Sequence, residues 1–296
     1  MQIGISQGSF NFLNLPIDKL SAKLKKIGFD CYDYGISGFW AVNPIFNENR
    51  NTWVKYFSNK RNFIESQGMR VNQTHAIFPA DFDKEQPFTF TQKVIDQLRR
   101  EIEATAILGA KYIVIHPLKI SFKHKDKEKD FYKNVEEFSK ITPILQEFGI
   151  KNCMENLCSR DALTNRFSQT GCSTPEDMIK YVDSLNDNCN NYCACLDVGH
   201  SNLIDLSPAE AVRKLKDKLE VLHVSDNNGI LDQHNPIGMG IIDWKDFAKS
   251  LKEINFQGVF SLEVSSFRKY YALGEKALWK MVEFCFESAK SLLENC

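Results

Sequence analysis

The chain has 296 residues, and its 37 Lys and Arg almost balance its 38 Asp and Glu. At roughly 150 residues per domain this length allows two domains, but α/β barrels of about 250 residues fold as one. The hydrophobic share of 43% and the charged share of 25% are ordinary for a globular protein and argue against a disordered or fibrous chain. A net charge of -1 gives no general attraction to nucleic acid or to an anionic membrane.

The first residues, the apolar runs and the cysteines bear on the cellular compartment of the protein. The first residues, MQIGISQGSF, lack the basic and then apolar pattern of a signal peptide, and no apolar run reaches the roughly 18 residues of a membrane span. The nine cysteines are odd in number and contain no CxxC pair. We therefore expect free thiols, a cytoplasmic location and no contact with a membrane.

Short apolar runs alternate with amphipathic stretches along the whole chain. Strands are predicted at residues 2–6, 31–36, 70–78, 111–117, 150–157, 192–200, 219–226 and 259–266. Several of these runs, such as YIVI and YCACL, are continuously apolar, which is typical of parallel strands covered on both faces.

Helices are predicted between the strands. Residues 16–27 begin with a proline and end before Gly28, and residues 91–108 repeat apolar side chains four positions apart. Thr174 and Ser207 each precede a proline, and Ser207-Pro-Ala-Glu210 has the pattern of a capping box. Residues 277–293 carry an apolar stripe, which we interpret as packing onto the strands, with a homo-oligomer surface as the alternative.

Eight strands alternating with eight helices predict one closed (β/α)8 TIM barrel over residues 1–296. No linker-like stretch divides the chain. The runner-up, a doubly wound open sheet, would be expected to carry a GxGxxG turn after an early strand, and GISQGSF does not match it.

Metal-ligand side chains gather at the predicted strand ends, where such barrels carry their chemistry. The candidates are His75, His116, Glu155, Asp197, His200, His223, Asp232, His234 and Glu263. They include five of the six histidines, and only His124 lies elsewhere. Buried carboxylates cost several kcal/mol unless they are paired or metal-bound, so the convergence of three acids with His223 predicts a divalent cation. Imidazole and carboxylate without thiolate favour Zn, Mn, Fe or Co.

The strings ENL (155–157), CLDVGH (195–200), HVSDNNG (223–229), DQHNPIGMGIIDW (232–244) and SLEV (261–264) resemble the xylose isomerase-like TIM barrel superfamily. Within it the chain is most similar to the sugar phosphate isomerase/epimerase group. The resemblance runs from the first strand to the last helix and implies one metal bound by Glu155, Asp197, His223 and Glu263.

The same superfamily contains the endonuclease IV type of apurinic-site nuclease, which holds three zinc ions. This resemblance implies further metal positions at His75 and His116 with Glu155, and at His200, Asp232 and His234. Two departures favour sugar chemistry: Val198 replaces the nuclease threonine, and residues 224–228 (VSDNN) lack the nuclease lysine. The loops also lack the cluster of basic residues that a DNA-binding face needs, so we do not expect nucleic acid as a partner.

The resemblance implies a metal-dependent isomerase or epimerase that acts on a small sugar, sugar phosphate or cyclitol. Glu155 and Glu263 would remove and return a proton through an enediolate, with a divalent metal polarising the carbonyl. The alternatives are a zinc phosphodiesterase, an inosose dehydratase-like lyase and a sugar-binding barrel without catalysis. His200 would bind a second metal, bind a substrate hydroxyl, or hydrogen-bond to the metal-binding side chains. Weaker candidates for substrate contact are Trp40, Phe78 and Arg268.

Overall fold

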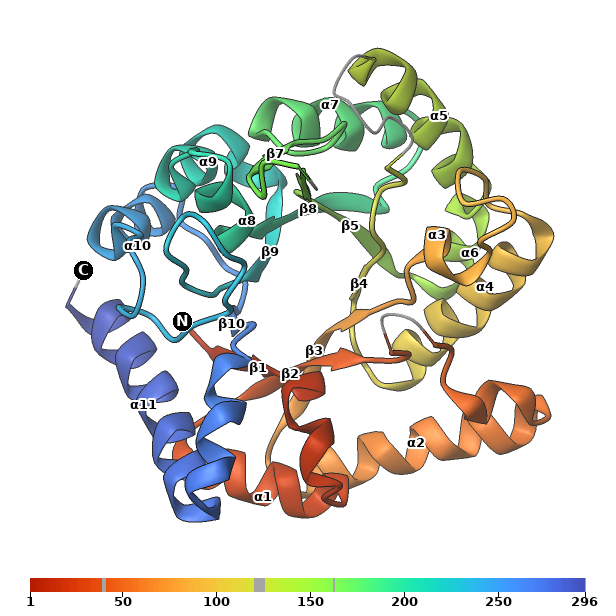
Figure 1. Ribbon diagram of the computed structural model, residues 1–296. Coiled ribbons are helices and arrows are strands. Elements are labelled where there is room, and N and C mark those ends of the chain that lie inside the picture. The colour runs from red at the N-terminus through yellow and green to blue at the C-terminus, as the bar shows by residue number, and fades with distance from the viewer. Residues whose placement is uncertain (39–40, 120–125, 162, 296) are drawn as a thin grey trace.

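The computed structural model describes residues 1–38, 41–119, 126–161 and 163–295 (Figure 1). Eight parallel strands form a barrel: β1 (Ile3–Ser6), β2 (Cys31–Gly35), β3 (Arg70–His75), β4 (Tyr112–Val114), β5 (Lys151–Glu155), β8 (Tyr192–Asp197), β9 (Leu219–His223) and β10 (Phe260–Leu262). The predicted (β/α)8 TIM barrel is therefore confirmed.

The strands pair in the order β10-β1-β2-β3-β4-β5-β8-β9. The remaining seam, between β9 and β10, is closed by one parallel bridge between Val224 and Leu262. At this bridge the Val224 amide donates to Ser261 O over 2.8 Å, and the Glu263 amide donates to Val224 O over 2.9 Å.

Helices surround the strands (Figure 1). They are α1 (Ile17–Ile27), α2 (Arg50–Ser66), α3 (Pro79–Phe82), α4 (Gln92–Ile107), α5 (Lys127–Ser139), α6 (Thr142–Phe148), α7 (Pro175–Leu185), α8 (Val198–Leu203), α9 (Pro208–Leu215), α10 (Trp244–Glu253) and α11 (Glu275–Glu294). The described residues also form the 3-10 helices η1 (Gln7–Leu13), η2 (Pro44–Asn47), η3 (Lys216–Lys218) and η4 (Ser266–Leu273). Among the described residues, no helix is both long and apolar enough to cross a membrane.

The helix ends follow the sequence signals with one exception. Gly28 caps α1, and Thr174 forms a full capping box with Asp177 at α7. Ser207 accepts from the Glu210 amide, but the Glu210 carboxylate contacts Arg213 instead of completing the predicted box. Along α11, Leu278, Val282, Cys285 and Ala289 are buried, as expected for packing on the barrel.

The strands are shorter than predicted at the ends that carry the site. The predicted strand at 70–78 stops at His75, and Pro79 begins α3. The predicted strand at 192–200 stops at Asp197, because the Asp197 carboxylate accepts from the His200 amide and caps α8. A short hairpin, β6 (Cys158–Arg160) with β7 (Phe167–Gln169), follows β5 and was not predicted.

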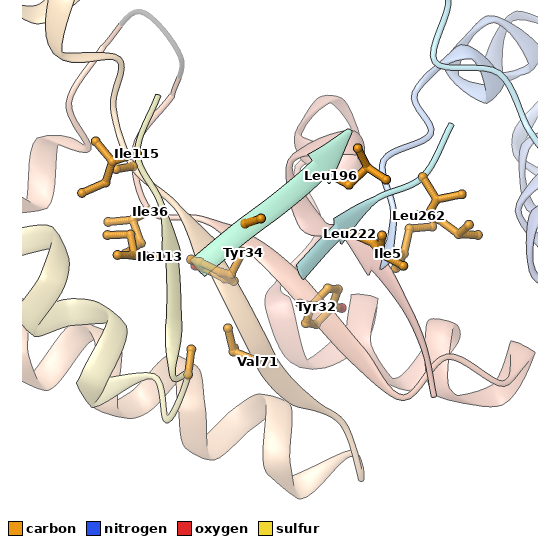
Figure 2. Close-up of a cluster of buried hydrophobic side chains, with 14 of the residues drawn as sticks. Ile5, Tyr32, Tyr34, Ile36, Val71, Ile113, Ile115, Leu196, Leu222 and Leu262 are labelled. Carbon is orange, nitrogen blue, oxygen red and sulfur yellow. The ribbon is translucent and has the colours of Figure 1, made fainter. Parts of the chain in front are cut away.

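Side chains alternate between the two faces of each strand, as β geometry requires. Those facing outward pack against the helices in the main core. Figure 2 shows part of this layer, where Ile5, Leu222 and Leu262 from three strands lie together. The inward side chains form a second cluster of Val114, Cys153, Cys193, Cys195 and Val221, in which Cys153 Sγ lies 2.8 Å from Cys193 Sγ.

Candidate functional site

Two groups of side chains that could hold a metal ion converge at the carboxyl ends of the strands. In each group the ligand atoms all lie within 4.8 Å of one another, and the groups share Glu155. One group is Glu155, Asp197, His223 and Glu263, and the other is His75, His116 and Glu155.

In the first group, three of the four side chains are almost wholly buried, and Glu263 retains 16% exposure. His223 Nδ1 lies 2.9 Å from Glu155 Oε1 and 3.5 Å from Glu263 Oε2. Glu155 Oε2 and Asp197 Oδ2 are buried without a well-aligned hydrogen bond. Buried carboxylate oxygens in this state are stabilised by a cation, so the residues present fit a divalent metal.

In the second group, His75 Nδ1 donates to the Ala76 carbonyl over 2.9 Å. This bond leaves Nε2 as the lone-pair nitrogen of the neutral ring, and Nε2 lies 3.1 Å from His116 Nε2. His116 Nε2 is in turn 2.7 Å from Glu155 Oε2. Both imidazoles therefore present a nitrogen toward the shared carboxylate.

His200, Asp232 and His234 form a looser cluster beside these groups. His200 Nδ1 donates to Asn156 O, and His234 Nδ1 donates to Glu263 O, each over 2.9 Å. Their Nε2 atoms lie 3.9 and 3.3 Å from Asp232 Oδ2. Sequence reasoning placed all nine of these residues in one region, and the structure brings them together there.

Burial and neighbouring charges shift the pKa values of the site carboxylates in opposite directions. Burial raises the pKa of Asp197 to about 7, although the neighbouring His200 opposes this rise. Burial acts in the same sense on the pKa of Glu155, but the charge of His223 and the contacts of both His223 and His116 with its oxygens outweigh burial and hold this pKa well below its usual range. Burial lowers the pKa of His116 to about 4, so its ring is neutral near pH 7 and available as a ligand.

Asp33 is a site residue that sequence reasoning missed. It comes from the middle of β2, is 4% exposed, and places Oδ2 3.0 Å from His223 Nε2. Its other oxygen, Oδ1, is buried without a hydrogen bond. The signal that could have found it is a carboxylate inside the otherwise apolar and aromatic run CYDYG.

The loop after β9 is organised by the carboxylate of Asp226. Asp226 Oδ2 accepts from the Gly238 amide over 3.0 Å, the Gly240 amide over 2.9 Å and Trp244 Nε1 over 2.8 Å. This loop carries Asp232 and His234, so Asp226 sets their backbone path.

The weaker substrate candidates lie in different surroundings. The Phe78 ring stacks on His116 at a centroid distance of 4.0 Å, beside the second group. The Arg268 guanidinium donates to Gly8 O and Ser9 O, each over 3.0 Å, and thereby ties η4 to η1. Trp40 lies outside the described residues.

The cleft over the site has two parts, both of which reach His75 and Glu263. The first lobe, of about 570 Å³, has a mixed lining, and we call it the polar lobe because it is the more polar of the two. Its polar side chains include Gln7, Asn11, Asn14, Asp33, Ser37 and Asn43, and its apolar ones include Phe10, Leu15, Ile17, Ile36 and Val42. The apolar lobe, of about 630 Å³, has an apolar part formed by Phe78, Pro79, Pro87, Phe88, Leu157 and Phe167. Its polar lining includes the metal-ligand residues His116, Glu155, His200, Asp232 and His234 together with Asp81, Lys119, Ser159 and Arg160.

Residues 21–281 match the model of the xylose isomerase-like TIM barrel family, and the chain belongs to that family. It is 22% identical over 288 residues to a D-psicose 3-epimerase of Enterocloster bolteae, covering 95% of this chain and 88% of that protein. An inosose isomerase of Bacillus licheniformis is 26% identical over 189 residues, covering 62% of this chain and 63% of that protein.

Solved structures show the same fold. A D-psicose 3-epimerase crystallised in the presence of D-fructose matches with a TM-score of 0.73 and 18% identity, over 99% of both chains. The IOLI protein with a bound zinc atom matches with a TM-score of 0.73 and 19% identity, over 100% of this chain and 99% of that one.

Proposed function

We propose that this protein is a metal-dependent isomerase or epimerase acting on a keto sugar or a cyclitol. The observation that carries the proposal is the convergence of Glu155, Asp197, His223 and Glu263 at the barrel mouth, with two carboxylates facing the cleft. The similarity to a D-psicose 3-epimerase and to an inosose isomerase supports the same class of chemistry.

These four residues would hold a divalent cation, and their imidazole and carboxylate atoms suit Zn, Mn, Co or Fe. When bound, such a cation supplies Lewis-acid polarisation of a substrate carbonyl. The group of His75, His116 and Glu155 would hold a second ion.

Glu155 and Glu263 would perform the proton transfers. Glu263 lines both lobes of the cleft and Glu155 lines the apolar lobe, so a substrate lying across them meets both carboxylates. One carboxylate takes the proton from the carbon beside the carbonyl, which leaves an enediolate. Return of a proton to the opposite face of that carbon gives the epimer, and its return to the former carbonyl carbon gives the isomer. His200 would orient a substrate hydroxyl.

Solvent deuterium exchange tests this proposal. The metal-loaded protein in D2O should incorporate deuterium into at least one member of a panel of ketoses, inososes and their phosphates. Glu155→Gln and Glu263→Gln should each abolish exchange, whereas Glu136→Gln, a change at an exposed helix position, should not. Exchange that persists in both site variants would contradict the two-carboxylate mechanism.

The nuclease alternative is favoured by one observation, the second group of His75, His116 and Glu155 next to the first. A zinc phosphodiesterase would bind three zinc ions per chain and cleave DNA that contains an abasic site. Metal content together with this cleavage assay separates the two proposals. A dehydratase would instead release water from an inosose, which product analysis of the same panel detects.

We also propose a cytoplasmic location. The eight cysteines among the described residues are all free, as expected in a reducing compartment. We further propose that the chain assembles into a homo-oligomer, and light scattering of the purified protein measures the mass that tests this.

A further inference from the structure

We infer that the substrate is a keto sugar that carries an apolar substituent, such as an alkyl or aryl glycoside, rather than a free monosaccharide. The inference rests on the proposed function and adds the substrate class. It comes from the two lobes that meet above the metal-ligand residues, of which the second is the more apolar.

The cleft is larger than a free monosaccharide. Pockets of about 300–1,000 Å³ enclose a drug-sized ligand, and each lobe falls within that range by itself. A free hexose, with its dozen non-hydrogen atoms, is smaller than such a ligand and would fill one lobe at most. The other lobe would then stay filled with water beside the reacting carbon.

The polar lobe fits the hydroxylated part of the substrate. Gln7, Asn11 and Asn14 supply side-chain amides around it, which both donate and accept hydrogen bonds. Ser37 and Asn43 add a hydroxyl and a further amide to this lining. Asp33 lines the same lobe, and its Oδ2 atom contacts His223, which connects this lobe to the metal-ligand residues.

The apolar lobe fits a substituent without hydroxyl groups. Phe88 and Phe167 line it together with Pro79 and Pro87, and Phe78 is held in place by its stacking on His116. A hydroxyl-rich ring placed here would lose water without gaining hydrogen bonds from these side chains, whereas an aryl or alkyl group gains from leaving water.

The two lobes meet at His75 and Glu263. A substrate spanning the cleft therefore places the bond between its sugar and its substituent close to the metal-ligand residues. The reacting carbon then belongs to the sugar ring, and the substituent anchors that ring from the other side.

Binding of matched glycosides to the metal-loaded protein tests the inference without requiring turnover. Phenyl glucoside should bind about 10- to 100-fold more tightly than methyl glucoside or glucose in calorimetry, because the ring area it buries is that of a buried aromatic side chain. Phe88→Ala should remove most of this gain and leave methyl glucoside binding unchanged. Phe284→Ala, at an exposed aromatic on α11, should change neither affinity.

A second variant examines the polar lobe independently of the metal ligands. Gln7→Leu should weaken the binding of phenyl glucoside and methyl glucoside by the same factor. Equal affinity for the two glycosides, or tighter binding of glucose 6-phosphate than of phenyl glucoside, would overturn the inference. Tighter binding of glucose 6-phosphate would indicate that the apolar lobe takes an anion held by Lys119 and Arg160.

Failure of this inference differs from failure of the proposed function. Metal-dependent deuterium exchange into free sugars without a preference for glycosides would leave the function standing and overturn the substrate class. Preferred binding of phenyl glucoside without exchange into any keto sugar or keto glycoside would support the binding preference and overturn the proposed function.

Discussion

Asp33 Oδ2 lies 3.0 Å from His223 Nε2, on the side of the imidazole opposite the Nδ1 atom that faces Glu155 and Glu263. A carboxylate in this position holds the ring in place, and a proton held on Nε2 would leave the Nδ1 lone pair to a metal in place of its present contact with Glu155 Oε1. The β2 strand thus controls the orientation of a ligand that belongs to β9.

Replacing Asp33 by Asn should weaken metal binding by about 10- to 100-fold, as is typical for the partners of metal-bound histidines. Competition with a chromophoric chelator measures this affinity directly. Asp217→Asn, a change on the surface helix η3, serves as the control and should leave the affinity unaltered. An unchanged metal affinity in Asp33→Asn would show that His223 is held by other groups.

Removing the metal should destabilise the protein. A ligand that binds only the folded state at about 100 times its dissociation constant contributes about 2.7 kcal/mol, so a chelator should lower Tm by several degrees. Differential scanning calorimetry with and without the chelator provides the measurement. Equal Tm values in the two scans would argue against a metal site in this barrel.

Asp197→Asn should separate folding from metal binding. Burial raises the pKa of this carboxyl to about 7, which shows that its charge is unfavourable without a cation. The variant keeps an oxygen to accept from the His200 amide, so the metal-free protein should be as stable as the unaltered one or more stable. It should also lose the rise in Tm on adding metal. A metal-dependent rise that survives in the variant would place the ion elsewhere.

Gly240→Ala should destabilise the loop that carries Asp232 and His234. A Cβ at this position would lie 2.1 Å from Asp226 Oδ1 and 2.3 Å from Asn227 O, so the Asp226 hydrogen bonds would have to shift. We expect a loss of about 1–3 kcal/mol in the free energy of unfolding, measured with urea. Gly8→Ala is the control, because its nearest neighbour would be 3.8 Å away. Equal stability of the two variants would contradict this packing argument.

Glu137 gives the fold a pH dependence that is independent of the site. Its side chain is fully buried and lies 2.6 Å from the ammonium groups of both Lys133 and Lys140, and its Oε2 accepts from the Phe90 amide. Burial raises the pKa of Glu137, but these partners outweigh it and bring the pKa below its ordinary value of 4.5.

A carboxyl with a lowered pKa stabilises the folded state above the unfolded pKa, and this contribution disappears as the pH falls through the folded value. Glu137→Gln should therefore cost about 1.5–3 kcal/mol near pH 7 and much less near pH 3. Urea unfolding at both pH values measures the difference. Glu136→Gln, at the exposed neighbouring position, should show little effect at either pH.

Much of the fold and the site could be predicted because the two depend on the same periodicity. Alternation within strands places Glu155, Asp197 and His223 on the inner face at the ends of apolar runs. The predicted strand ends were wrong where a side chain binds the backbone that would otherwise continue the strand. The Asp197 side chain caps α8, so residues 198–200 are helical. The β6–β7 hairpin was missed because its strands are three residues each and only one of those six residues is buried. Asp33 was missed because a carboxylate within a strand carries no spacing signal, and its partner lies 190 positions away.

The seam between β9 and β10 has a consequence for the order in which the barrel opens. His223 and Glu263 stand on opposite sides of this seam, where a single bridge at Val224 replaces a full ladder. An ion coordinated by both residues would link β9 to β10 at the strand pair that is held by this single bridge. The amides of Val224 and Glu263 should then exchange with solvent much faster after the metal is stripped, while those in β2 and β3 should keep their protection.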